Sequence, residues 1–323
     1  MVYKSGDKMS KIFDSLVGHV VGDAMGTPVE FFMRKYLQED KVTEMLGNIG
    51  QHCEPVGSWS DDTSMELALI DSINNTNKID YDDIMNNFAL WIEKGKYTPT
   101  NHAFGVGRCC LKAIYNFKKG TPSLECGNLE KEHMSNGSLM RILPIALYSY
   151  CKKLTEDELE DITKKVSSLT HRQDAVYLAC YMYIMFVIDL LKGLDKDTAY
   201  INLKNRKYDY NEESIHLYSR ILKDDIRDLS LDDINSSGYV VDTLEASLWC
   251  LLKNNSYEDT IIEAINLGQD TDTIAGISGA MAGIIYGYDN IPKRWIDKLQ
   301  HKEYLFDMFN KFEENMEEIE VIE

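Results

Sequence analysis

Apolar residues recur along most of the chain at spacings of three and four, and short polar stretches separate the segments that carry this pattern. Such spacing is typical of helices with one buried face. Strand signals are scarce, and the β-branched and aromatic run at 238–241 is too short to indicate a sheet. We therefore predict an all-α fold. The predicted helices, with ends good to about two to four residues, span residues 10–25, 63–75, 80–94, 104–117, 138–151, 155–169, 174–193, 211–223, 243–253, 257–267, 273–287 and 303–318.

Two of these helices have a marked start. Thr63 with Glu66, and Asp242 with Glu245, have the spacing of a capping box, in which the first side chain accepts from the backbone three residues on and the acid bonds back. Both pairs stand in front of apolar positions at helical spacing. We therefore expect helices to begin at these pairs.

The chain is predicted to form one compact domain over residues 1–323. It has no repeat of fixed period, and its most polar interval, 205–237, is expected to be a surface excursion and not a linker between domains. The core is expected at about 12–290. The C-terminal stretch 313–323 contains six glutamates and is expected to be a solvated tail.

Composition excludes several classes of partner. The chain has 323 residues, 44% of them hydrophobic, and a formal net charge of -19, which opposes binding to duplex nucleic acid or to an anionic membrane. The longest apolar run, 175–188, is shorter than a bilayer span and is closed by Asp174 and Asp189, so it predicts a buried core helix. No signal peptide is visible at the N-terminus.

Cysteine and histidine usage indicates a reducing compartment without a zinc site. The seven cysteines form no C-x-x-C pair, and the seven histidines form no H-E-x-x-H motif. We expect free thiols in a cytoplasmic protein. A monomer is the default expectation.

Two adjacent carboxylates, Asp61 and Asp62, stand between the hydroxyls of Ser60 and Thr63. Helix capping would use one acid at most, whereas a dense group of oxygen ligands is what a hard cation such as Mg²⁺ selects. The stretch is thus open to two interpretations, a simple capped helix and half of a metal site.

A second acidic group has the same layout near the C-terminus. Asp270, Asp272 and Thr273 precede an apolar segment rich in alanine and glycine, which is typical of a helix buried among others. Buried carboxylates need hydrogen bonds, protons or cations. If these acids face the first acidic group, the two groups together could bind a pair of divalent ions. The alternative interpretation is that the two stretches are unrelated capped helices.

The same D-x-D-T sequence occurs in haloacid-dehalogenase phosphatases, where the first aspartate is the nucleophile. That motif should follow an apolar parallel strand near the N-terminus, whereas Asp270 follows a helical segment near the C-terminus. The context therefore argues against a phosphatase of this kind.

Two further stretches suit an anionic ligand. A turn at Asn136, Gly137 and Ser138 offers backbone N–H groups and a hydroxyl to a phosphate, with Arg141 close in sequence. A simple turn with a serine cap explains the same residues. Gly105 and Gly107, in a short G-x-G, would allow close backbone approach to a ligand.

Six motifs follow one another along the chain. They are GHVVGDAMGTPVEF at 18–31, WSDDTSM at 59–65, SNGSLMR at 135–141, LTH at 169–171, GYVVDTLEASLW at 238–249 and GQDTDTIAG at 268–276. In their order and spacing, over about residues 12–290, they resemble the ADP-ribosylglycohydrolase family. The resemblance implies an all-α fold with a central cleft that holds two Mg²⁺, or Mn²⁺ in some members, and binds ADP-ribose.

The resemblance also assigns roles to individual residues. Glu30 matches a loop glutamate that orients water or acts as acid and base, and Asp61 and Asp272 would share in the catalytic centre. The implied metal ligands are Ser60, Asp61, Asp62, Asp270, Asp272 and Thr273. The implied substrate-binding residues are Gly105, Gly107, Asn136, Gly137, Ser138, His171 and Tyr239. Many members have threonine where Ser60 stands, and serine keeps the oxygen ligand.

The function implied is metal-dependent hydrolysis of the glycosidic bond between ADP-ribose and a modified protein side chain, with arginine as the favoured linkage. Serine-linked or other O- or N-linked ADP-ribose, carried by a protein or a small molecule, stays open as the substrate. A non-catalytic ADP-ribose-binding protein and a phosphoester hydrolase are the alternatives from other classes.

Overall fold

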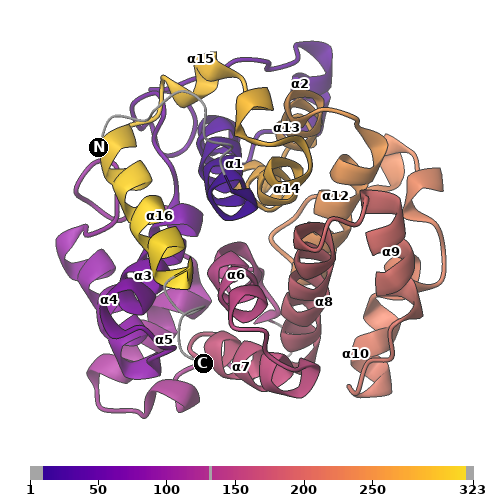
Figure 1. The fold of residues 1–323 in the computed structure, drawn as a ribbon. Helices are drawn as coiled ribbons and strands as arrows, with labels where there is room; N and C mark the ends of the chain where they lie inside the picture. Colours follow the sequence, from indigo (N-terminus) through magenta and orange to yellow (C-terminus); the bar gives the residue numbers. More distant parts are fainter. Residues whose placement is uncertain (1–9, 131–132, 318–323) are drawn as a thin grey trace.

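The computed structural model describes residues 10–130 and 133–317, and within these ranges the chain consists of helices joined by turns and loops. The described residues form no sheet; two isolated bridges, between Asn128 and His171 and between Ser135 and Tyr239, are the extended pairings they contain. The helices form one domain, in which segments from both ends of the chain meet at the centre (Figure 1). The prediction of an all-α fold is confirmed.

The helices are of very different lengths, and short 3-10 turns join several of them. The α-helices are α1 (Lys11–Gly26), α2 (Arg34–Glu39), α3 (Asp61–Thr76), α4 (Tyr81–Lys94), α5 (Arg108–Lys118), α6 (Leu143–Cys151), α7 (Glu156–Ser168), α8 (Asp174–Leu191), α9 (Lys196–Asn205), α10 (Glu212–Leu217), α11 (Ser219–Leu222), α12 (Val240–Lys253), α13 (Tyr257–Ile265), α14 (Thr271–Tyr286), α15 (Lys293–Ile296) and α16 (Lys302–Glu317). The 3-10 turns are η1 (Thr27–Val29), η2 (Ser123–Glu125), η4 (Leu139–Arg141), η5 (Ile226–Asp228), η6 (Leu231–Asp233) and η7 (Tyr288–Asn290).

The pairing of α1 with α14 is the most extensive helix contact in the described chain. The two helices approach closely because glycines line their contact: a Cβ on Gly22 would overlap the carbonyl oxygen of Ala275, and one on Gly18 would overlap that of Gly279. At the end of the pair, Gly26 lies directly against the backbone of Asp272. This close approach brings the loop after α1 to the start of α14.

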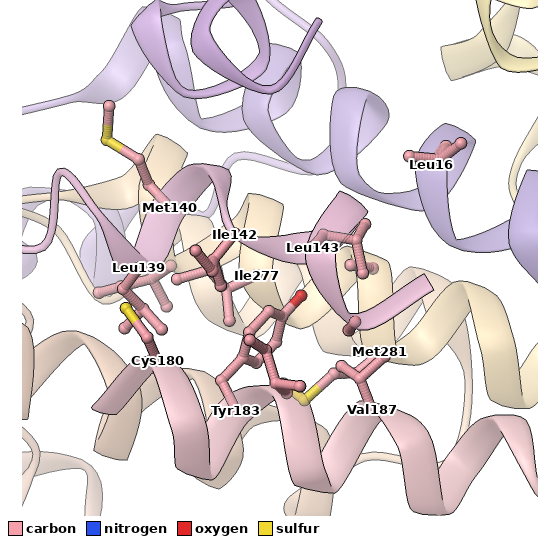
Figure 2. Close-up of a cluster of buried hydrophobic side chains, with 14 of the residues drawn as sticks. Leu16, Leu139, Met140, Ile142, Leu143, Cys180, Tyr183, Val187, Ile277 and Met281 are labelled. Carbon is pink, nitrogen blue, oxygen red and sulfur yellow. The ribbon is translucent and has the colours of Figure 1, made fainter. Parts of the chain in front are cut away.

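The remaining helices enclose this pair. In Figure 1, α13 and α12 lie beside α14, and α16 lies beside α3. Figure 2 shows the core where α6, α8 and α14 meet, with Leu143, Tyr183, Val187, Ile277 and Met281 pointing toward one another.

Helix α8 carries the apolar run 175–188. By length and composition it could cross a membrane, with a mean hydropathy of 1.7, but 89% of the stretch is buried inside the protein. It packs against α6, α7 and α9. The prediction of a buried core helix is confirmed.

Both predicted capping boxes are wrong in detail. Helix α3 begins at Asp61, with Ser60 as its N-cap, and Thr63 lies inside the first turn. Glu66 is fully buried beside His19 and does not reach back to the helix start. Long-range partners in the core have displaced the local interactions that the spacing suggested.

The start of α12 shows the same kind of displacement. This helix begins at Val240, so the second half of the run 238–241 belongs to its first turn, while Tyr239 is the N-cap and pairs with Ser135 in an isolated bridge. Asp242 accepts a hydrogen bond from the Ser237 hydroxyl at 2.6 Å, which closes the turn before the helix.

Other helix boundaries also differ from the prediction. Gly105, with a φ of 72°, delays α5 to residue 108. The predicted helix 211–223 is broken into α10 and α11 at Tyr218, whose buried hydroxyl donates to the carbonyl of Ala175 at 2.6 Å. The short helices α2 and α15 have too few apolar positions for the periodicity to predict them. Residues 313–317 of the acidic tail belong to α16, and residues 318–323 lie outside the described part of the chain.

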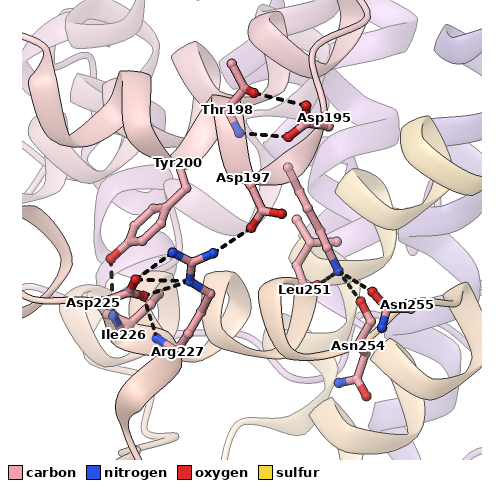
Figure 3. Close-up of polar contacts among 11 residues, drawn as sticks. Asp195, Asp197, Thr198, Tyr200, Asp225, Ile226, Arg227, Leu251, Asn254 and Asn255 are labelled. Carbon is pink, nitrogen blue, oxygen red and sulfur yellow. Dashed lines mark hydrogen bonds and ion pairs between the residues drawn. The ribbon is translucent and has the colours of Figure 1, made fainter.

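The polar interval 205–237 is fastened to the domain by α9, a helix that the sequence did not predict. Arg227 donates to Asp197 of α9 at 2.7 Å and pairs with Asp225, while the Tyr200 hydroxyl accepts from the backbone of Ile226 (Figure 3). Ile226 and Tyr200 are buried. The interval is therefore a packed surface segment, as expected, and not a linker.

The glycine contact between α1 and α14 generates a stability prediction. Gly22→Ala should lower the free energy of unfolding by about 1–3 kcal/mol, because the added methyl group would displace the backbone of α14. Urea denaturation measures the change. Gly107→Ala is the matched control, since Gly107 has a negative φ and nothing within 4 Å of an added Cβ. Equal stability of the two variants would contradict the close packing.

Candidate active site

The first acidic group occupies the N-terminus of α3. Ser60 has extended backbone, and its hydroxyl accepts from the N–H of Asp62 at 3.3 Å. Asp61 and Asp62 form the first turn, where the helix dipole favours negative charge. All three side chains are buried.

Asp23 of α1 holds this helix start in place. Its carboxylate accepts from the backbone N–H of Ser60 at 2.9 Å, from the N–H of Thr63 at 3.1 Å and from the Thr63 hydroxyl at 2.6 Å. Asp23 is completely buried, and burial raises its pKa. The sequence analysis did not single out this residue, because its partners are 37 to 40 positions away.

The second acidic group occupies the N-terminus of α14. Asp270 holds the N-cap position without a hydrogen bond to the helix backbone, and its carboxylate accepts from the Thr273 hydroxyl at 3.2 Å and from the side-chain amide of Asn136. The Thr271 hydroxyl donates to the carbonyl of Gly26 at 2.9 Å, which ties the cap to the end of α1. Asp270 and Asp272 are buried, as the sequence predicted.

Glu30 follows η1 and is also buried. Its carboxylate lies 2.7 Å from Nε2 of His52, a residue that the sequence analysis did not select. The His52 ring packs against Phe104, with ring centroids 5.1 Å apart. This contact fixes the direction in which the Glu30 side chain points.

The structure brings these acids together as two overlapping groups. Oxygens of Glu30, Asp270 and Asp272 lie within 4.8 Å of one another, and so do oxygens of Asp61, Asp62 and Asp272. Asp272 belongs to both groups. The prediction that the two helix starts face each other is confirmed.

Crowding changes the protonation of these carboxyl groups. Burial, and then the charge of Glu30, raises the pKa of Asp270 to about 6 and that of Asp272 well above its ordinary value. Burial, and then the charge of Asp61, raises the pKa of Asp62 well above its ordinary value. Burial, and then the charge of Glu30, does the same for the pKa of Asp61. Ionised together, these groups need positive charge between them.

The donor set fits a hard divalent cation. One carboxylate oxygen of Asp62 and one of Asp272 are buried with no hydrogen-bond partner. Such oxygens are costly unless a proton or a cation binds them, and oxygen ligands are the type that Mg²⁺ and Mn²⁺ select. Ser60 and Thr273 place a hydroxyl beside each group.

The acidic cluster forms part of the wall of a pocket of about 590 Å³. This volume is in the range of small-molecule and cofactor sites. Eleven predicted site residues line the pocket: Glu30, Asp61, Asp62, Gly105, Gly107, Asn136, Gly137, Tyr239, Asp270, Asp272 and Thr273.

Ser138, His171 and Arg141 lie behind the pocket wall and not on it. The Ser138 hydroxyl faces the sulfur of Cys180 at 3.4 Å, and the Arg141 guanidinium donates to the carbonyl of Gly137 and to Thr170. All three are fully buried. Direct phosphate contact by Arg141, suggested from its position after the turn, is therefore wrong for this arrangement, and these side chains support the turn from inside.

His171 has the same supporting position. Its ring lies between the hydroxyls of Ser135 at 2.7 Å and Thr170 at 2.8 Å, and a Cβ on Gly137 would lie 3.1 Å from it. Burial, and then Arg141, lowers the pKa of His171 to about 3, so the ring is neutral. Ser60 likewise contacts Asp62 without lining the pocket.

The pocket also has a basic part that the sequence analysis missed. Arg108 and Lys112 of α5 line it together with His133. Their spacing of four places Arg108 and Lys112 on one helix face, and this was the signal available in the sequence. Glu130 lines the same part of the pocket and lies 3.4 Å from the Lys112 ammonium and 3.3 Å from Nε2 of His133, so this part carries cations together with one carboxylate.

The fold and the pocket together define an all-α protein with a buried acidic cluster beside a ligand-sized cavity. A family model described as ADP-ribosylglycohydrolase matches residues 4–320. The chain therefore belongs to the ADP-ribosylglycohydrolase family, a family of glycohydrolase enzymes.

Named relatives and a solved structure agree with this assignment. ADP-ribosylarginine hydrolase Tri1 of Serratia proteamaculans (strain 568) is 31% identical over 300 residues, which cover 92% of this chain and 77% of that protein. ADP-ribosyl-[dinitrogen reductase] glycohydrolase of Rhodospirillum rubrum is 27% identical, with 89% and 90% of the two chains covered. A structure titled ADP-ribosylglycohydrolase-related protein complex has the same fold, with a TM-score of 0.80 at 24% identity over 95% of this chain and 98% of that one.

The role of Asp23 generates a second prediction. Asp23→Asn should lower the free energy of unfolding by about 1–3 kcal/mol, because an amide cannot accept all the hydrogen bonds that the carboxylate receives from Ser60 and Thr63. Thr63→Val, which removes only the hydroxyl donor to Asp23, should lower the free energy of unfolding by less than Asp23→Asn does. Urea denaturation of both variants tests the order, and a larger loss for Thr63→Val would contradict it.

The raised pKa of Asp270 generates a third prediction, for protein in excess chelator. The ordinary pKa is 3.8 and the folded value is about 6, so the folded state binds more protons between these values and stability falls as pH rises through this window. The fall attributable to Asp270 is at most about 3 kcal/mol.

Comparison with Asp270→Asn tests this contribution, because the variant lacks the Asp270 titration and also the charge by which Asp270 raises the pKa of Asp61, Asp62 and Asp272. The free energy of unfolding should decline less between pH 4 and 6 in the variant. Identical slopes for the two proteins would show that Asp270 titrates normally in the fold.

Proposed function

We propose that this protein hydrolyses the glycosidic bond between ADP-ribose and a modified arginine side chain, with two divalent cations, Mg²⁺ or Mn²⁺, bound in the pocket. The observation that carries the proposal is the pair of overlapping carboxylate groups in the wall of a ligand-sized pocket. The family supplies the reaction class. The arginine linkage is supported by the printed name of the Serratia relative.

The proposed ligands of the cations are the oxygens of Ser60, Asp61, Asp62, Asp270, Asp272 and Thr273. Bound there, divalent cations would neutralise the crowded carboxylates and polarise the oxygens of the sugar and of the attacking water. Glu30 is close enough to Asp270 and Asp272 to belong to the same centre.

Glu30 is proposed to act on the water molecule. The Glu30 carboxylate accepts a proton as the water oxygen attacks C1″ of the distal ribose, and the bond from C1″ to the guanidine nitrogen breaks. The proton is then available to the departing nitrogen. His52 orients the Glu30 carboxylate through their 2.7 Å contact.

Residues on the rest of the pocket wall are proposed to bind and orient ADP-ribose. Gly105 and Gly107 allow close approach of the ligand, while Asn136 and Gly137 offer a turn, and Tyr239 adds an aromatic surface. Arg108 and Lys112 supply positive charge for the diphosphate. This division lets the basic part hold the anionic end while the acidic part holds the cations.

We also propose a monomeric, cytoplasmic protein. The cellular location is supported by the cysteines: all seven lie in the described part of the chain, and none is in a disulfide.

Turnover assays test the proposed function. Arginine-linked ADP-ribosylated protein should release intact ADP-ribose, identified by mass spectrometry, and both EDTA and Asp272→Asn should reduce the rate at least about a hundredfold, since Asp272 belongs to both carboxylate groups. Asp161→Asn, the same exchange at an exposed position of α7 that does not line the pocket, is the matched control for the effects of mutation itself.

Other outcomes would replace the proposal. Release of AMP or inorganic phosphate would indicate phosphoester hydrolysis, and turnover confined to serine-linked substrate would change the linkage. Binding of ADP-ribose without any turnover would indicate a non-catalytic protein. Full activity in EDTA would remove the cations from the mechanism.

A further inference from the structure

Phe31 is an aromatic side chain in an unusual position. It follows Glu30 directly, it lines the pocket, and it is 52% exposed. An exposed phenylalanine gains little from burial in the folded protein, so its place on the pocket wall calls for another explanation.

The backbone of Phe31 is in the left-handed region, with a φ of 63°. A bulky residue without the freedom of glycine is an outlier there, and such outliers persist where the surroundings hold them and often at ligand sites. Glycine or asparagine would be easier to accommodate at this position. The phenylalanine is therefore kept at a cost in stability.

Neighbouring loops fix this conformation. The N–H of Phe31 donates to the carbonyl of Gln269 at 2.6 Å, and the N–H of Gln269 donates back to the carbonyl of Phe32 at 3.0 Å. Gln269 is itself left-handed, with a φ of 64°. Arg34 adds hydrogen bonds to the carbonyls of Leu267 and Ile234 at 2.7 and 2.6 Å. The ring of Phe31 is thus carried by a loop tied to the start of α14.

The charges around Phe31 indicate what would lie against it. It adjoins Glu30 in sequence, and its loop is bonded to the residue before Asp270, so it belongs to the acidic part of the pocket. The basic residues Arg108 and Lys112 come from a different element, α5. A substrate with a diphosphate and a separate cationic group would match both parts.

We propose that Phe31 is a specificity-determining residue whose ring stacks on the guanidinium group of ADP-ribosylated arginine; the inference rests on the proposed function. Guanidinium is planar, cationic and weakly hydrated, and it is attracted to the face of an aromatic ring. A serine-linked substrate has no such group. The ring therefore favours arginine as the leaving side chain.

Substitutions that separate aromaticity from size test the proposal. Phe31→Leu should lower kcat/KM for arginine-linked ADP-ribose roughly five- to tenfold, mainly through KM, because it keeps an apolar side chain but loses the ring face. Phe31→Tyr should stay within about twofold of wild type. Free ADP-ribose, titrated calorimetrically, should bind both variants as it binds wild type.

Phe31→Gly separates function from structure. Glycine accepts the left-handed backbone, so the thermal midpoint of this variant should equal or exceed that of wild type while arginine-linked turnover falls as in Phe31→Leu. A lowered midpoint that accompanies the loss of turnover would make the residue structural and overturn the proposal.

Two other results would also overturn it. Phe31→Leu could turn over the arginine-linked substrate at the wild-type rate, or it could lose affinity for free ADP-ribose by the same factor, which would put the ring on ADP-ribose itself. Absence of arginine-linked turnover in the wild-type protein is a distinct result, which overturns the proposed function and this inference with it.

Discussion

Mutual repulsion among buried carboxylates is the constraint on which the site depends. Glu30, Asp61, Asp62, Asp270 and Asp272 are all buried in the wall of the pocket, and their oxygens form two overlapping groups. Without a cation, the protein relieves the repulsion by protonation, as the raised pKa of Asp270 indicates. A ligand that brings positive charge would also relieve the repulsion. The two buried oxygens that accept no hydrogen bond, one of Asp62 and one of Asp272, would bind such a ligand.

Neutral and oppositely polarised groups hold the acids in position. Helix N-termini contribute N–H groups, Asp23 fixes the start of α3, and the Asn136 amide donates to Asp270. The contacts named here to the four aspartates come from N–H, amide and hydroxyl groups and not from lysine or arginine, and Glu30 lies 2.7 Å from Nε2 of His52. The positive side chains of the pocket, Arg108 and Lys112, come instead from α5.

Much of the fold could be predicted from the sequence, because helix periodicity and polar breaks are local signals. The acidic helix starts were also predictable: Asp61 and Asp270 stand at helix N-termini, where the residue types indicated them. Helix α9 was not predicted because it has few buried positions, among them Tyr200, and because its faces are mostly polar.

What could not be predicted depends on contacts between distant segments. The role of Asp23 follows from its bonds to Ser60 and Thr63, and the inward direction of Ser138 and His171 follows from the packing behind the turn. Sequence order identifies a turn but not which of its side chains faces a ligand. The strained backbone of Phe31 likewise arises from pairing with Gln269.

The pairing of α1 with α14 has a consequence for biosynthesis. The two helices begin at Lys11 and Thr271, so α1 leaves the ribosome long before its partner exists. At roughly 5–20 residues per second, this interval is on the order of tens of seconds. During that time the glycine-lined face of α1 has no α14 to pack against, and the two carboxylate groups lack Asp270 and Asp272. The acidic cluster is therefore completed only after the start of α14 has been synthesised.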